Sequence, residues 1–194
     1  MATFGYETIG SLGSTLSNYK DASQYTCPED GTAQSITAAL KASSGTWEGH
    51  VKCAIYKASD LSSPITNGET EEKTLTLNTT AAWFTFNFPT PPTLEANTDY
   101  VLCAWADTGS GSTARMLRDD DASVNRWYVS ATYSDTWGDL PASDRTGKFS
   151  IYCTYTPSGG GLSIPVAMRH YRNLRTAIAS TRKLTFPKIA PLRI

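Results

Sequence analysis

Two histidines, His50 and His170, are the residues from which general-base chemistry near neutral pH would start. One precedes an expected strand and the other lies in a basic C-terminal segment, so nothing in the sequence brings them together. The chain has no Gly-x-Ser-x-Gly elbow, no His-Glu-x-x-His and no phosphate-binding glycine loop. Any β-sandwich offers carboxylate pairs for glycoside hydrolysis, but no motif singles one out. The sequence therefore predicts no catalytic residues and a protein that is not an enzyme.

The densest run of charge is Asp119-Asp120-Asp121, with Asp107 and Asp135 in neighbouring loops. Ca²⁺ prefers several hard oxygen ligands, which such a run offers. The EF-hand spacing is absent, however, and consecutive side chains on an extended backbone diverge. We predict no metal site and no cofactor, with calcium at residues 119–121 as the weaker alternative. A solvated loop, or an acceptor for an arginine of a neighbouring molecule, is the preferred interpretation.

Aromatic residues near expected loops offer a second kind of site. Trp47, Tyr133 and Trp137, with Tyr128 nearby, are candidates for a platform on which a sugar ring stacks. Aromatic residues at alternating strand positions more often belong to a core or an interface, however. Sugar binding is therefore the second interpretation of these residues.

The four cysteines, Cys27, Cys53, Cys103 and Cys153, each fall within an expected strand. None forms a Cys-x-x-Cys pair, which argues against a zinc site or a redox motif. Two interpretations stay open. They are either four small buried hydrophobic residues, or they form one or two disulfides between facing strands, whose connectivity the spacing does not fix.

The elements that must position these residues are short strands. Ten strand-like segments recur, separated by turns rich in Gly, Asn, Pro and Ser, and several of them alternate between apolar and polar residues. No helical period interrupts them, so residues 1–156 are expected to form an all-β, jelly-roll-like antiparallel β-sandwich of about 8–10 strands. The expected strands are 4–9, 23–27, 33–42, 50–58, 73–77, 83–88, 100–106, 114–117, 126–133 and 148–155.

Two of these segments, 83–88 and 100–106, are the centre of the pattern. In the first, Phe84, Phe86 and Phe88 share one face. In the second, both faces are apolar, which suits the interior of a packed two-sheet structure. Its two faces consist of Val101, Cys103 and Trp105 on one side and Tyr100, Leu102 and Ala104 on the other.

The net charge of −1 for 194 residues conceals two oppositely charged parts. Residues 1–156 contain ten basic and 18 acidic residues, a net of −8, whereas residues 157–194 contain seven basic and no acidic residues, a net of +7. No apolar run approaches the roughly 18 residues that a membrane span needs. The N-terminus shows no basic segment followed by an apolar run, so no signal peptide is visible.

The pattern changes after Thr156. Residues 157–162 predict a glycine-rich hinge, and residues 163–194 predict a basic arm that begins as a short helix and continues as a proline-interrupted extended segment. The arm is too short to form a core of its own, so its apolar residues are expected to be buried either against the surface of the preceding domain or against a partner. The residues expected to bind the partner are Met168, Arg169, Tyr171, Arg172, Leu174, Arg175, Ile178, Leu184, Phe186, Ile189 and Leu192.

Several core and turn signatures carry a family resemblance. They are Cys-Pro-Glu-Asp-Gly at 27–31, Cys-Ala-Ile-Tyr at 53–56, the strand 83–88, Asn-Thr-Asp-Tyr-Val-Leu at 97–102 and Phe-Ser-Ile-Tyr-Cys-Thr-Tyr at 149–155. Together they resemble jelly-roll modules of carbohydrate-binding type, which occur in microbial extracellular proteins and in virus structural proteins. The resemblance covers about residues 4–155 and implies a fold. It carries no site residues and does not fix function.

These observations predict a non-enzymatic structural protein of a multi-subunit particle, with a virion decoration, tail or surface protein as the leading assignment. The expected partners are other subunits of the same assembly, because the Leu, Ile, Phe and Pro residues of the arm favour protein over nucleic acid. The alternatives are a carbohydrate-binding module for attachment to a cell surface and a filament subunit that exchanges a strand. The expected location is a virion or an extracellular surface.

Overall fold

A computed structural model describes residues 1–143 and 145–159 of the chain. The predicted arm, residues 163–194, and part of the predicted hinge lie outside the described residues. Met1–Ser158 form one compact unit, which we call the sandwich. All its regular elements are strands, and the described residues contain no helix, which confirms the all-β class.

Most strands are short. Their bounds are β1 (Ala2–Gly5), β2 (Leu12–Thr15), β3 (Tyr19–Cys27), β4 (Gly31–Ala42), β5 (Trp47–Lys57), β6 (Lys73–Leu77), β7 (Ala82–Asn87), β8 (Thr93–Leu94), β9 (Thr98–Ala106), β10 (Ser110–Gly111), β11 (Ala114–Asp119), β12 (Asn125–Ser130), β13 (Arg145–Thr146), β14 (Lys148–Phe149) and β15 (Ile151–Pro157). The four longest, β3, β4, β5 and β9, have nine to 12 residues.

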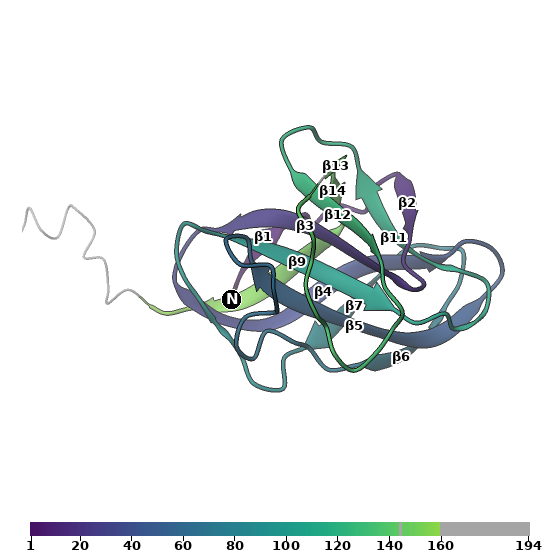
Figure 1. The fold of residues 1–194 in the computed structure, drawn as a ribbon, viewed down its shortest axis with the longest axis horizontal. Coiled ribbons are helices and arrows are strands. Elements are labelled where there is room, and N and C mark those ends of the chain that lie inside the picture. The colour runs from purple at the N-terminus through teal and green to yellow at the C-terminus, as the bar shows by residue number, and fades with distance from the viewer. Residues whose placement is uncertain (144, 160–194) are drawn as a thin grey trace, which may run out of the picture. The chain divides into compact units, whose positions relative to one another are not determined.

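The strands form two sheets in which every pair is antiparallel (Figure 1). The first sheet has the order β1-β15-β4-β11-β14, with β2 beside β11 and β7 and β8 beside β4. The second has the order β10-β5-β9-β3-β12-β13, with β6 beside β5. The predicted two-sheet antiparallel sandwich is therefore confirmed.

Every expected strand segment contains a strand, and the differences lie at the segment ends and in the number of strands. β1 stops at Gly5, not at residue 9, because Gly5 has a φ of 127° and a Cβ there would meet Ile151 O at 2.5 Å. β12 ends at Ser130, and the following residues leave the sheet. The described residues form 15 strands and not the expected 8–10, because the expected segment 148–155 contains both β14 and β15 and four short strands, β2, β8, β10 and β13, lie outside the expected segments.

The inter-sheet core consists of the alternating residues that the sequence placed on inward faces. Ile36 and Leu40 of β4 face Ile55 of β5 and Leu102 of β9, and Phe86 of β7 is fully buried among them. Close packing of such side chains supplies most of the driving force for folding. The sequence pattern in 83–88 and one face of 100–106 are thereby explained.

The other face of β9 belongs to a second core, which we call the outer cluster. Val101, Cys103 and Trp105 pack there with Tyr56 and Trp127. No second sheet covers them. Residues 131–141, which we call the strap, cross this face and contribute Trp137 and Leu140 to the cluster.

The strap is held by side chains that donate hydrogen bonds to its backbone carbonyls. Trp105 Nε1 donates to Ala131 O at 3.1 Å and Trp127 Nε1 to Pro141 O at 2.7 Å. Tyr56 Oη donates to Gly138 O at 2.9 Å, and Lys52 Nζ to Ser134 O. The buried Lys20 donates to Trp137 O and Asp139 O. A loop without secondary structure is therefore anchored along its length.

All four cysteines are buried free thiols. Cys27, Cys53 and Cys153 belong to the inter-sheet core and Cys103 to the outer cluster. Cys53 and Cys103 point to opposite faces of the second sheet, so they do not face each other. Burial raises the pKa of each thiol, which keeps it protonated and unreactive at neutral pH.

Candidate functional site

A surface hollow lies where β5 begins and β9 ends. It has a volume of about 450 Å³ and lies between the first residues of β5, the loop after β9 and the start of the strap. Its functional side chains are Asn18, Glu48, His50, Asp107 and Tyr133. We call it the acidic pocket.

Strand pairing brings the two central groups of this pocket together. In the β5–β9 ladder Val51 is opposite Ala106, so His50 and Asp107 are the next residues outward. Asp107 N donates to His50 O at 3.0 Å, and His50 Nδ1 lies 2.9 Å from Asp107 Oδ2, where an N–H on that nitrogen donates to the carboxylate. This hydrogen bond, with the nearby charge of Glu72, raises the pKa of His50 above its ordinary value.

The floor of the pocket depends on two glycines and a buried tryptophan. Trp47 is fully buried and donates from Nε1 to Thr108 O at 3.0 Å. A Cβ at Gly109, whose φ is +62°, would meet Trp47 Nε1 at 2.2 Å, and one at Gly49 would meet Asp107 Oδ1 at 2.2 Å. Trp47 thus fixes the backbone on which Asp107 is presented.

The pocket carries more negative than positive charge. Glu48 is exposed beside His50, and Tyr133 Oη donates to Glu72 Oε2 at 2.6 Å. Asp107 Oδ1 is screened from solvent and has no hydrogen-bond partner among the described residues. A Cβ at Gly49 would meet this oxygen at 2.2 Å, so Oδ1 lies against the backbone of β5, and the exposed acidic group of the pocket is Glu48. The arrangement suits a positively charged group that can lie against the ring of Tyr133.

A histidine–aspartate pair also occurs in nucleophilic catalysis, where the histidine activates a hydroxyl or a thiol. Within the part of the chain that the structure describes, no hydrogen bond joins His50 to a serine, threonine or cysteine. Among the described residues, no nucleophile is therefore aligned with the pair.

The three residues of the expected sugar platform are separated. Tyr133 lines the acidic pocket and is half-buried, whereas Trp47 lies beneath that pocket. Trp137 is buried under the strap, with its ring centroid 5.3 Å from that of Trp105. Neither tryptophan presents a ring face to solvent. Both tryptophans are core residues, so they form no shared surface with Tyr133.

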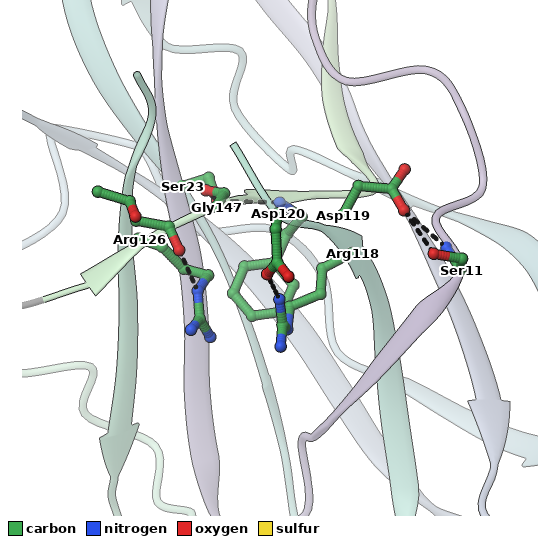
Figure 2. Close-up of polar contacts among 9 residues, drawn as sticks. Ser11, Ser23, Arg118, Asp119, Asp120, Arg126 and Gly147 are labelled. Carbon is green, nitrogen blue, oxygen red and sulfur yellow. Dashed lines mark hydrogen bonds and ion pairs between the residues drawn. The ribbon is translucent and has the colours of Figure 1, made fainter. Parts of the chain in front are cut away.

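The acidic run at residues 119–121 makes separate contacts with the sandwich (Figure 2). Asp119 accepts hydrogen bonds from the backbone and hydroxyl of Ser11, both at 2.9 Å, and Asp120 pairs with Arg118. Asp121 lies 3.3 Å from Lys148 Nζ. The three carboxylates thus point to different partners. No group of three or more His, Cys, Asp or Glu side chains suited to a metal occurs among the described residues.

Figure 2 also shows Arg126 beside this region, with Nε donating to Thr146 O at 3.1 Å. Arg126 and Arg118 exert their charge on Asp21 of β3, which is fully buried. Neither carboxylate oxygen of Asp21 has a hydrogen-bond partner within the described part of the chain. Burial raises the pKa of Asp21 well above its ordinary value, although Ser14 and the two arginines favour the charged form.

The outer face of the first sheet is a different kind of surface. Trp83 of β7 and Tyr152 of β15 are half-buried, with ring centroids 5.3 Å apart at 68°. Thr37 lies between Thr85 and Tyr152 in the strand register, and its hydroxyl is 2.9 Å from that of Thr85. We call this surface the hydroxyl face, because its central strands carry Thr, Ser and Asn side chains there.

The sequence missed both the His50–Asp107 pair and the Trp83–Tyr152 pair. Each joins residues far apart in the chain, and the missing signal was the strand order. Pairing β5 with β9 would have identified the first, and pairing β15 and β7 with β4 the second. The partner-binding residues expected in the arm, from Met168 to Leu192, lie outside the described residues.

No protein-family model matches the chain, and a comparison with curated proteins found no match either. None of the described residues forms a helix long and apolar enough to cross a membrane.

Proposed function

We propose that the chain is a non-enzymatic structural subunit of a multi-subunit particle, of which a virion is the leading candidate, and that residues 163–194 anchor each copy to a neighbour. The observation that carries this proposal is the division of charge, −8 in residues 1–156 against +7 in residues 157–194. Opposite charges on two parts of one chain favour association between copies.

The contacts within the sandwich strengthen this argument, because most of its cations are already engaged. Lys20 and Lys52 are buried beneath the strap. Lys57, Lys73, Arg118 and Lys148 each pair with a carboxylate of the sandwich. The carboxylates left over make the surface acidic, and a basic segment is the complementary partner.

The apolar residues of the arm supply the second part of the mechanism. Leu184, Phe186 and Ile189 are large hydrophobic residues next to basic ones. Burying them would contribute roughly 25 cal/mol per Å² of apolar surface removed from water. Repetition of the contact over many copies would add avidity.

The test is sedimentation velocity of the purified full chain over a range of concentrations. We expect the wild type to form assemblies larger than a monomer. The triple variant Leu184→Ser, Phe186→Ser and Ile189→Ser should sediment as a monomer. The matched control is Ile9→Ser with Leu12→Ser, which replaces exposed apolar residues of the sandwich. Equal assembly of the triple variant and the control would refute the anchoring role.

A second candidate function, carbohydrate binding by a jelly-roll-type module, is favoured by the hydroxyl face. Partly exposed aromatic rings beside hydroxyl groups match the apolar faces and hydroxyls of sugars. Trp83→Ala should abolish binding to a glycan array, whereas Tyr133→Ala, which alters a half-buried aromatic side chain on another surface, should not. No glycan signal from the wild type would remove this candidate.

A further inference from the structure

The acidic run at 119–121 was expected to receive an arginine from a neighbouring molecule, but its carboxylates already have partners in the sandwich. Asp119 accepts hydrogen bonds from Ser11 and Tyr6, and Asp120 and Asp121 pair with Arg118 and Lys148. A cation from another chain would have to displace these partners. The acceptor for a basic segment must therefore lie elsewhere.

The acidic pocket meets the requirements that the run does not. The side chain of Asp107 is 25% exposed and, among the described residues, hydrogen-bonds only to His50. Glu48 is exposed at the same hollow, and the ring of Tyr133 forms part of its wall. A guanidinium group has donors arranged in a planar fork and stacks on aromatic rings, so it matches this combination better than a lysine does.

The pocket and the end of the described chain lie at opposite ends of the sandwich. The described chain ends beside the start of β4, where Pro157 pairs with Gly31 and Ser158 N donates to Asp30 O at 2.8 Å. The pocket lies beyond the other end of β4, roughly 36 Å away for a strand of this length. Figure 1 shows the same opposition, since β15 ends at the left and the arrowhead of β9 points to the right.

We propose that the acidic pocket of one copy binds an arginine from residues 163–194 of the next copy, so that the copies associate head to tail. This inference rests on the proposed function and names the surface that receives the arm. The contact is heterologous, because the two copies use different surfaces. Such contacts form rings when the rotation closes and filaments when it does not.

Three features of the pocket favour an arginine as its ligand. Its charge is complementary to the +7 segment, and its volume of about 450 Å³ admits a guanidinium with part of its aliphatic stem. Its wall also includes an aromatic ring. The arginines closest to the hinge, Arg169, Arg172 and Arg175, are the first candidates.

The experiment uses full-length variants and sedimentation equilibrium at low salt. The pocket variant is Glu48→Gln with Asp107→Asn, and the arm variant is Arg169→Gln, Arg172→Gln and Arg175→Gln. The control is Glu7→Gln with Asp120→Asn, which removes the same charge at exposed positions elsewhere. We expect pocket and arm variants to self-associate at least about tenfold more weakly than the wild type, and the control to behave like it.

Mixing the two weak variants provides the decisive measurement. The arm variant keeps an intact pocket and the pocket variant keeps an intact arm, so an equimolar mixture should form heterodimers that do not extend further. A mixture that stays monomeric would show that the arm of one copy does not bind the pocket of another, which would overturn the head-to-tail contact.

Two further outcomes separate this inference from the function on which it rests. If the arm variant loses association and the pocket variant does not, the proposed function stands and the pocket is the wrong acceptor. If the pocket variant loses binding of Ca²⁺ or of a sugar while association is unchanged, the pocket serves a small ligand. Glu48→Arg is the second pocket variant, because Glu48 is exposed and its substitution preserves the His50–Asp107 bond.

Discussion

The two faces of the second sheet cover two cores that are closed in different ways. The inter-sheet core is closed by another sheet, and its residues are almost all apolar. The outer cluster is closed by the strap, which has no regular structure and is held by lysine, tyrosine and tryptophan donors. The stability of the inter-sheet core therefore comes from the close packing of apolar side chains. The stability of the outer cluster comes from such packing together with hydrogen bonds to the strap.

Two adjacent residues of β3, Lys20 and Asp21, show this difference. Lys20 points into the outer cluster, where its Nζ lies 4.8 Å from the centroid of Trp105 and donates to strap carbonyls. Asp21 points to the opposite face and has no hydrogen-bond partner among the described residues. Both charges are removed from water, but Lys20 donates hydrogen bonds to the strap, whereas the charged form of Asp21 is favoured only by Ser14 and by the charges of Arg126 and Arg118, which do not offset its burial. Burying a charge is tolerated where partners replace the water.

The largest effect is expected in the inter-sheet core. Phe86→Ala should lower the free energy of unfolding by about 3–5 kcal/mol, because it leaves a cavity between two sheets that are held by their own hydrogen bonds. Urea denaturation measures the change. Phe88→Ala, near the end of the same strand pattern, is the comparison and should cost less. Equal losses would mean that the core relaxes freely around both positions.

A smaller global effect is expected when the outer cluster loses its covering residue. Trp137→Ala should cost about 3 kcal/mol, the low end for a buried tryptophan, because the strap can detach locally without separating the sheets. Hydrogen exchange should show lost protection at the strap and unchanged protection in β4. Uniform loss across both sheets would contradict separate closure of the two cores.

The next prediction concerns the compensated charge. Lys20→Met keeps the length of the side chain but removes the donors to Trp137 O and Asp139 O. Hydrogen bonds to charged groups are worth about 1.5–3 kcal/mol, and part of this is offset because the charge no longer has to be buried. We expect a net loss of about 1–2 kcal/mol in chemical denaturation. Lys41→Met, on the first sheet, is the control and should leave stability almost unchanged.

The sequence predicted the inter-sheet core well, because strict alternation shows which side chains of a strand share a face. The residues of 83–88 and 100–106 lie on the faces that their period indicated. The strap could not be predicted, since Trp137 and Leu140 follow no period in a segment with Gly and Pro. The acidic pocket was missed for a related reason: His50 and Asp107 meet only through the pairing of β5 with β9.

Asp21 was missed because the expected strand began at residue 23, so Lys20 and Asp21 lay outside it. In the structure β3 begins at Tyr19, and the two side chains point into different cores. A charged dipeptide at the start of a strand carries no signal of burial. Only the neighbouring strands, β9 and β12, determine that the carboxylate is enclosed.

The smallest effect, and the only one of opposite sign, is expected at the uncompensated charge. Asp21→Asn removes a carboxyl group whose pKa is raised by burial. Between the unfolded pKa near 3.8 and the higher folded pKa, the native state keeps a proton that the unfolded chain has lost. The free energy of unfolding of the wild type therefore falls as the pH rises through this window, and the penalty is complete above the folded pKa.

Asparagine has no such titration, so the difference between the variant and the wild type isolates Asp21. Near pH 4 the two proteins should differ by less than about 1 kcal/mol, and above the window the variant should be the more stable one. Asp119 and Asp121 provide the internal contrast, because their hydrogen bonds lower their pKa values and give the opposite slope with pH. A variant that is less stable than the wild type at pH 8 would show that Asp21 is compensated after all, and that the two cores treat their buried charges alike.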